Sequence, residues 1–353
     1  MTLKSKRNHY NVKFLKGYGH SISVKDSKII LKNCADPFSP PEIEEWYPNR
    51  MPYSKIVLSG KGYLSTEALA MLSENNRNVI LVDSQGYPQC VMNGVMHSLT
   101  GTNYRIAQYD TFRIPSKRDY LSRQIISAKI DSQIQFLKST DNPLVEPGIK
   151  KLEKHAKSLG NNVLHAEAVT SRIYFGAFAK LIDERFGFSA RNSPLTIKKY
   201  DATDVINALL NYGYAVLAGE ISKFVNGVGL DPYYGFYHKN HTSFQSLVYD
   251  MMEPFRWLVE CAVWKISDAK SRNRISKRQY SYTQKGMIVL EYDLIRKFLE
   301  LLERIFQKER RYDYKFGLKT KDGLKLVQEI TITKITVQNL ADYCLGKTNN
   351  FNI

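Results

Sequence analysis

The spacing of apolar residues changes once along this chain, and that change limits the folds it can adopt. In the first hundred residues apolar and polar residues alternate in short runs, as in SISVKDSKIILKN (21–33), which is typical of β-strands. After residue 120 the spacing becomes about 3.6, as for Ile126, Ile130, Ile134 and Leu137, which indicates an amphipathic helix. The pattern predicts an α+β protein, with a small β-rich N-terminal domain followed by a larger all-α domain.

The β-rich part can be divided further from its turn and cap signals. We expect a hairpin around the turn KDSK (25–28), a strand over 53–60 and a helix over 65–76 that begins at Ser65 or Thr66. Two more strands are expected around the turn DSQG (83–86). The glycines of SGKGYLST (59–66) lack the spacing of a phosphate-binding loop, so we interpret them as part of a strand-to-helix connection.

A polar stretch, AQYDTFRIPSKRDY (107–120), indicates a linker between the two parts. We therefore predict a β-rich domain over 1–108, a linker over 109–117 and a helical domain over 118–353. Helical patterns continue over 150–183, 201–226, 243–268 and 286–310, whereas the tail after about residue 311 shows no pattern that we can assign. Within this tail, ITVQNLADYCLG (335–346) is too short and weak to predict a helix-turn-helix.

The charge of the chain indicates a polyanionic partner. Its 51 Lys and Arg residues exceed its 34 Asp and Glu residues, the net charge is +17, and the excess is spread along the sequence. Nucleic acid is the commonest such partner, and a generally basic protein without this role is the alternative. Four separated cysteines without zinc spacing, no signal peptide and no apolar run of membrane-spanning length predict a cytoplasmic protein that does not enter a membrane.

Three segments of the helical part carry polar residues that a plain helix does not require. Glu167 lies in the helical segment HAEAVTSRIYFGAFAKLID (165–183), and His238 ends the glycine- and tyrosine-rich loop GLDPYYGFYHKN (229–240). Asp250 and Glu253, three residues apart in the segment 242–266, point to one side of a helix. Each has a structural alternative: compensation of the helix dipole, a packed histidine, or a solvated acidic face.

Pro254 directly follows Glu253 and predicts a kink at the acidic pair, because proline cannot donate a hydrogen bond to the carbonyl group of Asp250. If the acids and the histidine meet, they form a mostly oxygen site with one imidazole. Such a set suits Mg²⁺ or Mn²⁺ better than a structural zinc ion. In a strongly basic protein, a hard divalent cation points to phosphodiester chemistry.

The chain resembles the CRISPR-associated protein one family, the integrases of spacer acquisition, along nearly its whole length. The matching stretches are IVLSGKGYLSTEALAML with NVILVDSQG, then AKIDSQIQFL, AEAVTSRIYFGAF, DVINALLNYGYAVL, GLDPYYGFYH and SLVYDMMEPFR. The resemblance implies that Glu167, His238 and Glu253 are metal ligands and that Asp250 is an auxiliary catalytic carboxylate. It also implies that Asn207 and Asn211 make structural hydrogen bonds near the site.

The resemblance further implies a metal-dependent DNA endonuclease and integrase of antiviral defence. It would join the 3′-hydroxyl of a prespacer DNA to the repeat boundary of a CRISPR array by transesterification. The partners implied are double-stranded and branched DNA, a second copy of the chain bound through the β-rich domain, and CRISPR-associated protein two. A casposon-type transposase of the same family and a catalytically inactive DNA-binding subunit are the alternatives.

Basic residues outside the acidic cluster are candidates for contact with DNA phosphates. Arg191 belongs to a stretch that is richer in arginine and proline in the family, and its role here is correspondingly open. The run KISDAKSRNRISKR (265–278) is the other candidate, with a solvated helix end as the alternative. Its basic residues are Lys265, Lys270, Arg272, Arg274, Lys277 and Arg278.

Overall fold

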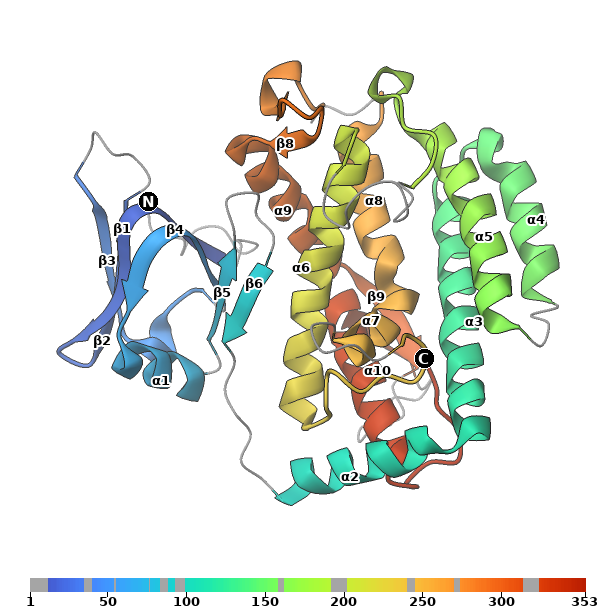
Figure 1. The fold of residues 1–353 in the computed structure, drawn as a ribbon, viewed down its shortest axis with the longest axis horizontal. Helices are drawn as coiled ribbons and strands as arrows, with labels where there is room; N and C mark the ends of the chain where they lie inside the picture. Colours follow the sequence, from blue (N-terminus) through green and yellow to red (C-terminus); the bar gives the residue numbers. More distant parts are fainter. Residues whose placement is uncertain are drawn as a thin grey trace. The chain divides into compact units, whose positions relative to one another are not determined.

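The chain forms two compact units, residues 1–97 and residues 98–353 (Figure 1). The computed structural model describes residues 12–34, 40–53, 55–75, 77–82, 88–92, 99–157, 162–191, 202–239, 245–269, 274–313 and 324–353. A β-rich part followed by a mostly helical part is the predicted α+β arrangement. The boundary between the units lies before the predicted one at residue 108.

The first unit is built on one six-stranded mixed sheet with the strand order β3-β2-β1-β4-β5-β6. The predicted hairpin is present, with Lys25 of β1 opposite Lys28 of β2 and with Asp26 and Ser27 at positive φ in the turn. β4 pairs in parallel with both β1 and β5, and helix α1 provides the crossover between β4 and β5. The bounds are β1 Val12–Lys25, β2 Lys28–Asn33, β3 Glu42–Trp46, β4 Lys55–Leu64, α1 Thr66–Glu74, β5 Asn78–Val82 and β6 Pro88–Met92.

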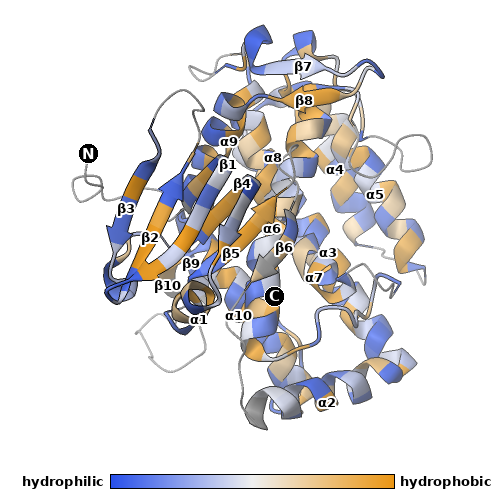
Figure 2. Ribbon diagram, turned by 60° about the vertical axis from the view of Figure 1, so that its left-hand side comes forward, coloured by the Kyte–Doolittle hydropathy of each residue, from blue (hydrophilic) through white to orange (hydrophobic). Residues whose placement is uncertain are grey.

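Local signals account for most of this unit. The hydroxyl of Ser65 accepts a hydrogen bond from the backbone N–H of Ala68 at 3.1 Å, so Ser65 is the N-cap of α1, as one of the two predicted choices. The core lies between α1 and the sheet and consists mainly of aliphatic side chains, Leu15, Ile22, Ile29, Leu31, Ile56, Leu58, Leu72 and Val79 among them. Three glutamates make the edge strand β3 largely hydrophilic (Figure 2), which discourages uncontrolled strand pairing.

The second unit is mostly helical, but it is not all-α. Its described part contains two small antiparallel sheets, β7 with β8 and β9 with β10, so the predicted all-α domain needs this correction. The helices are α2 Leu99–Arg113, α3 Pro115–Ser139, α4 Glu146–Ala156, α5 Val163–Phe178, α6 Val205–Val228, α7 Ser246–Met252, α8 Arg256–Ser267, α9 Tyr292–Phe306 and α10 Glu329–Cys344. The strands are β7 Tyr280–Tyr282, β8 Ile288–Leu290, β9 Glu309–Asp313 and β10 Leu324–Gln328.

Residues 109–117, predicted as a linker, belong instead to the end of α2 and the start of α3. Pro115 occupies the first turn of α3, where its missing N–H has no helical partner to lose. The polar composition of this stretch is that of a helix with one buried face: α2 buries Tyr104, Gln108, Thr111 and Phe112 and exposes residues such as Asn103 and Asp110.

The predicted helix over 243–268 is interrupted where Pro254 stands. α7 ends at Met252, a 3₁₀ turn covers Glu253–Phe255, and α8 begins at Arg256. The predicted kink at the acidic pair is therefore confirmed. No helix in the described ranges is both long enough and apolar enough to cross a membrane.

Candidate functional site

α3 brings a buried lysine to the centre of the helical unit. One face of α3 packs into the core through residues including Leu121, Ile125, Ile126, Ile130 and Leu137. Lys129 lies on this face, and only 4% of its side chain is exposed. A buried ammonium group requires compensating anions. They come from α5 and from the 3₁₀ turn after α7.

The first anion is Glu167 on α5. Asn162 is the N-cap of this helix, and its side chain accepts a hydrogen bond from the backbone N–H of His165 at 3.0 Å. One oxygen of Glu167, Oε1, accepts hydrogen bonds from Nζ of Lys129 and, at 2.8 Å, from the hydroxyl of Ser171 one helical turn later. About a quarter of the side chain stays exposed (26%), so Glu167 faces both Lys129 and solvent.

The loop between α6 and α7 carries His238 and is anchored on α2. The buried amide of Gln108 donates hydrogen bonds to the carbonyl groups of Asp231 and Tyr234 at 3.0 and 2.7 Å. The ring of Phe112 stacks on Tyr234 and packs edge-on against Phe236. The segment expected to be a linker thus helps to hold the histidine loop in place.

Asp250 of α7 fixes the end of this loop. Its fully buried carboxylate accepts hydrogen bonds from the backbone N–H groups of Phe236, Tyr237 and His238 at 2.7, 3.0 and 2.9 Å. The same carboxylate lies 2.7 Å from Nδ1 of His238. Because an ionised carboxylate only accepts hydrogen bonds, Nδ1 carries a proton, and in the neutral imidazole this leaves the lone pair on Nε2. Nε2 lies 3.9 Å from Oε1 of Glu253.

Gly235 is required for this arrangement. A Cβ atom at this position would lie 2.5 Å from Oδ2 of Asp250 and 2.9 Å from the carbonyl carbon of Ser246. Any side chain would therefore push the loop away from the carboxylate. Gly235 allows the loop backbone to approach α7, and this close approach directs the imidazole toward Glu253.

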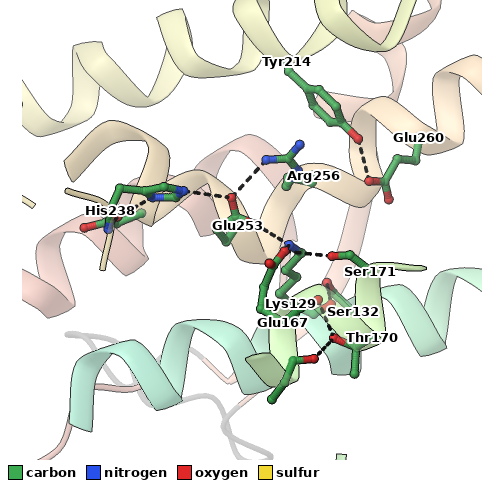
Figure 3. Close-up of polar contacts among 12 residues, drawn as sticks. Lys129, Ser132, Glu167, Thr170, Ser171, Tyr214, His238, Glu253, Arg256 and Glu260 are labelled. Carbon is green, nitrogen blue, oxygen red and sulfur yellow. Dashed lines mark hydrogen bonds and ion pairs between the residues drawn. The ribbon is translucent and has the colours of Figure 1, made fainter. Parts of the chain in front are cut away.

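Glu253 is the second anion beside Lys129 and lies at the centre of the cluster (Figure 3). Its Oε2 lies 2.7 Å from Nζ of Lys129, and its Oε1 accepts a hydrogen bond from Arg256 at 3.0 Å. Burial alone would raise the pKa of Glu253, but the positive charges of Arg256 and Lys129 outweigh it and lower the pKa to about 2. Glu253 is thus an anion that the surrounding cations stabilise.

The same balance holds for the other members of the cluster. Burial acts to raise the pKa of Glu167, but the neighbouring Lys129 lowers it below its ordinary value. Burial acts to lower the pKa of Lys129, and the carboxylates of Glu253 and Glu167 raise it instead. The cluster therefore holds both carboxylates ionised and the lysine protonated at neutral pH.

Behind Arg256 lies a fully buried carboxylate, Glu260, which accepts hydrogen bonds from two tyrosines. Tyr174 donates to Oε2 at 2.5 Å and Tyr214 donates to Oε1 at 2.7 Å. The guanidinium group of Arg256 stacks 4.1 Å from the ring centre of Tyr214. Burial raises the pKa of Glu260 despite these donors and Arg256. The network fixes Arg256, and through it the orientation of Glu253.

An arginine that contacts phosphate is expected to lie on an open surface, but Arg191 is half-buried. Its two terminal nitrogens donate hydrogen bonds to the side-chain oxygens of Asn207 and Asn211, at 2.7 and 2.9 Å. Its guanidinium group also lies 5.5 Å from the ring centre of Tyr214. Arg191 is therefore a packing partner of α6, because both amides point toward it. The structural hydrogen bonds predicted for Asn207 and Asn211 are present.

The predicted basic run lies partly within the described residues. Lys265 at the end of α8 is exposed, as are Arg274, Lys277 and Arg278, which precede β7. Lys270 and Arg272 lie outside the described residues. None of the four exposed residues forms an ion pair with another described residue. These positive charges are available to an anionic partner.

The four predicted site residues, Glu167, His238, Asp250 and Glu253, therefore converge from α5, the histidine loop, α7 and the 3₁₀ turn. Their chemistry suits a hard divalent cation: two carboxylates, and an imidazole whose Nδ1 is held by a third. Nε2 of His238 lies 3.9 Å from Oε1 of Glu253, so the imidazole and this carboxylate stand near one another without direct contact.

Within the described ranges, however, no three His, Cys, Asp or Glu side chains already stand close enough together to hold a metal ion. The ammonium group of Lys129 lies between Glu167 and Glu253 instead. One observation favours a cation at this position. Oε2 of Glu253 is fully buried and accepts no hydrogen bond of normal geometry from the described residues, although Lys129 lies beside it. The donor set fits a divalent cation if Lys129 moves aside.

Two site residues escaped the sequence reasoning. Lys129 lies in the stretch AKIDSQIQFL, and its i+4 spacing from Gln133 places it on the buried face with Ile126 and Ile130. Arg256 follows Glu253 by three residues, the spacing of a helical ion pair. In both cases the signal is a charged residue on an apolar helix face, which indicates a buried partner.

The fold and the cluster together define an α+β protein whose helical unit holds carboxylates, an imidazole and two cations in its interior. The family of CRISPR associated protein Cas1 matches residues 14–304, and the chain belongs to this family. The resemblance inferred from the sequence is thereby confirmed. The role of the family is that of a CRISPR-associated nuclease or integrase.

Individual relatives agree with this assignment. The chain is 27% identical to CRISPR-associated endonuclease Cas1 1 of Archaeoglobus fulgidus, over 68% of this chain and 73% of that protein. It is 28% identical to CRISPR-associated endonuclease Cas1 1 of Francisella tularensis subsp. novicida, over 77% of this chain and 82% of the relative.

Solved structures show the same fold. A casposase bound to integration product has a TM-score of 0.80 and 26% identity, covering 97% of this chain and 92% of that one. The Cas1 protein from Thermotoga maritima has a TM-score of 0.76 at 17% identity, covering 97% and 99%.

Proposed function

We propose that this protein is a divalent-metal-dependent DNA integrase and endonuclease of CRISPR spacer acquisition. It would join the 3′-hydroxyl of a prespacer DNA to the repeat boundary of a CRISPR array by transesterification. The observation that carries the proposal is that Glu167 and Glu253 meet at the position that Lys129 occupies, while Nε2 of His238 lies 3.9 Å from the other carboxylate oxygen of Glu253. Membership of the Cas1 family supports it.

Glu167, His238 and Glu253 would hold the cation, Mg²⁺ or Mn²⁺. When bound, the cation would supply Lewis-acid polarisation of a phosphoryl oxygen and neutralise charge that develops in the transition state. Asp250 contributes by holding the tautomer and the direction of the imidazole. Arg256 anchors Glu253, so the carboxylate is oriented before substrate arrives.

DNA binding would use charge outside the cluster. Lys265, Arg274, Lys277 and Arg278 are exposed and suit contacts with the phosphates of double-stranded or branched DNA. By resemblance to the family we also propose a homodimer through the sheet unit and an assembly with CRISPR-associated protein two. The net charge of +17 favours the long anionic partner that such an assembly would hold.

Strand transfer by a Glu167→Ala variant tests the proposal. The substrate is a branched DNA that carries a repeat boundary, with Mn²⁺ or Mg²⁺ present. We expect Glu167→Ala to lose at least 100-fold in rate, since a donor of the cation is removed. Glu153→Ala is the matched control, because Glu153 lies on α4 and pairs with Lys138 away from the cluster. Equal activity of Glu167→Ala and the control would reject the proposal.

A casposon-type transposase is the second candidate, and one observation favours it. The casposase bound to integration product shares 26% identity and a TM-score of 0.80 with this chain. Such an enzyme would use the same side chains on its own terminal repeats. Comparing strand transfer on CRISPR-repeat DNA with transfer on terminal-inverted-repeat ends separates the two, and the genes beside the coding sequence provide a second criterion.

A catalytically inactive DNA-binding subunit is the third candidate. In that case the acids would only neutralise Lys129 and Arg256. Metal-dependent cleavage of branched DNA by the purified protein, lost in Glu167→Ala, would exclude this candidate.

A further inference from the structure

Lys129 is the cation around which the cluster is organised. Its Nζ contacts Oε1 of Glu167 and lies 2.7 Å from Oε2 of Glu253. The side chains of Lys129 and Glu253 are 4% and 3% exposed, so the pair is shielded from water. Lysine is a compact point charge on a flexible stem, and its ammonium group can change position by rotation about four side-chain bonds.

Arg256, the other cation of the cluster, is held much more firmly. It donates a hydrogen bond to Oε1 of Glu253, and its guanidinium group stacks on Tyr214, which is itself bound to Glu260. Lys129, by contrast, contacts the cluster only through the two proposed metal ligands among the residues that the structure describes. If one cation leaves the cluster, the contacts therefore select Lys129.

The charge of the cluster indicates why one cation would leave. The cluster contains three carboxylates and two cations, so its charges sum to −1 with a neutral imidazole: Glu167, Asp250 and Glu253 against Lys129 and Arg256. A divalent cation would change this sum to +1, and departure of the lysine would bring it to zero. A divalent cation between Glu167 and Glu253 would stand a few ångströms from the ammonium group. Like charges at such a distance repel strongly in a site of low dielectric.

We propose that Lys129 is a positioning residue that competes with the divalent cation for Glu167 and Glu253. In the metal-free protein its ammonium group neutralises the two carboxylates and holds them together. When the cation binds, the ammonium group gives up its place between them. This inference rests on the proposed function, because it takes the cation site from it. Lys129 would thus set how tightly the protein binds metal and would keep the empty site from collapsing.

Calorimetric titration of the full chain with MnCl₂ tests the competition. Lys129→Met removes the charge and keeps much of the apolar stem. We expect it to bind Mn²⁺ at least tenfold more tightly than the wild type, because no ammonium group has to be displaced. Lys138→Met is the matched control: the same substitution on the same helix, at an exposed lysine that pairs with Glu153 at 2.6 Å. It should leave the affinity unchanged.

Thermal unfolding gives an independent readout. In EDTA, Lys129→Met should have a lower Tm than the wild type, because Glu167 and Glu253 lose their neutralising partner. In Mn²⁺ its Tm should rise by more than that of the wild type. Lys129→Gln replaces the charge by an amide donor and serves if Lys129→Met does not fold in EDTA. Its Tm should likewise be lower than that of the wild type in EDTA and rise by more in Mn²⁺.

The outcomes separate this inference from the proposed function. If the wild type binds Mn²⁺ in a manner lost in Glu167→Ala, but Lys129→Met and Lys129→Gln bind it no more tightly, the competition is wrong while the metal site stands. Failure of both lysine variants to fold in Mn²⁺ as well as in EDTA also overturns it, because the metal should then replace the lysine. If the wild type and Glu167→Ala titrate alike, the proposed function fails and this inference fails with it.

Discussion

Asp250 and His238 are joined twice: the carboxylate accepts a hydrogen bond from the backbone N–H of His238 and lies 2.7 Å from Nδ1 of its ring. The first contact fixes where the residue stands, and the second fixes which way its imidazole faces. The other oxygen of Asp250 accepts hydrogen bonds from the backbone N–H groups of Phe236 and Tyr237. Because these contacts use both carboxylate oxygens, Asp250 acts through His238. Its expected role as an auxiliary carboxylate is best described as orientation of the imidazole.

Asp250→Asn should weaken metal binding and strand transfer. The amide nitrogen would face a donor, either a backbone N–H or Nδ1 of His238, so one buried donor loses its acceptor. We expect a loss of about 10–100-fold in metal affinity or activity, the usual range for a residue that orients a ligand. Titration with Mn²⁺ measures it. Asp110→Asn on the exposed face of α2 is the control, and equal affinity of the two variants would contradict the role of Asp250.

Glu253 predicts a dependence of stability on pH in metal-free protein. Its pKa in the folded state is about 2, below the ordinary value of 4.5, so the folded state binds its proton less readily than the unfolded state. The resulting stabilisation, about 3 kcal/mol from this difference, is present above pH 4.5 and is lost as the pH falls toward 2. Urea unfolding in EDTA should therefore show the wild type and Glu253→Gln converging as the pH decreases. A constant difference between them from pH 7 to pH 3 would contradict this.

Tyr214→Phe tests the network behind Arg256. It keeps the ring on which the guanidinium group stacks, but it removes the hydroxyl that donates to Oε1 of Glu260. A buried carboxylate oxygen then lacks a partner, so we expect a loss of about 1–3 kcal/mol in the free energy of unfolding. The control is Tyr282→Phe, whose side chain is 63% exposed. A loss no larger than in this control would show that the network is not stabilising.

Gly213→Ala tests the packing of α6 beside the site. A Cβ atom at Gly213 would lie 2.4 Å from Cγ1 of Val259 and 3.0 Å from Cζ of Phe298. We expect overpacking to cost about 1–3 kcal/mol. At Gly219 on the same helix nothing lies within 4 Å of the added atom. Gly219→Ala should therefore gain about 0.5–1 kcal/mol from helix propensity. Unfolding in urea measures both, and effects of the same sign would contradict the packing shown.

The exposed basic run predicts a salt-dependent affinity for DNA. Neutralising Lys277 and Arg278 to glutamine should reduce the slope of log affinity against log salt by about 0.9 for each phosphate contact that is lost. Binding to a fluorescent duplex over a range of salt concentrations measures the slope. Lys151→Gln with Lys154→Gln on α4 removes the same charge elsewhere. If both pairs change the slope equally, the basic run has no special contact with DNA.

Much of the site could be read from the sequence because its signals are local. Ser65 caps α1 by accepting a hydrogen bond from the backbone N–H three residues later. Pro254 itself marks the place where the helix is interrupted. The rigid loop before His238 is likewise marked by its own glycines and proline. The resemblance to a family then joined segments that no local rule connects, and the structure brings Glu167, His238, Asp250 and Glu253 together.

The rest depended on contacts between residues far apart in the chain. Gln108 looks like a surface residue of a polar stretch, and only the fold shows that it holds the loop around Asp231. Arg191 was expected to contact phosphate from the resemblance to the family, and only the fold shows that Asn207 and Asn211 of α6 bind its guanidinium group. Lys129 is one of many lysines in a basic sequence, and its burial between two acids depends on three separate segments.

The close approach of Gly235 to Asp250 means that the orientation of His238 and the docking of α7 are gained or lost together. The imidazole has its direction only while α7 is docked against the loop, and α7 can dock only while the loop backbone lies flat against it. If α7 separates from the loop, the acidic side chains and the histidine are still present, but they no longer have the relative positions that the site requires. Activity should consequently disappear with the first local opening in this region, well before the helices themselves melt.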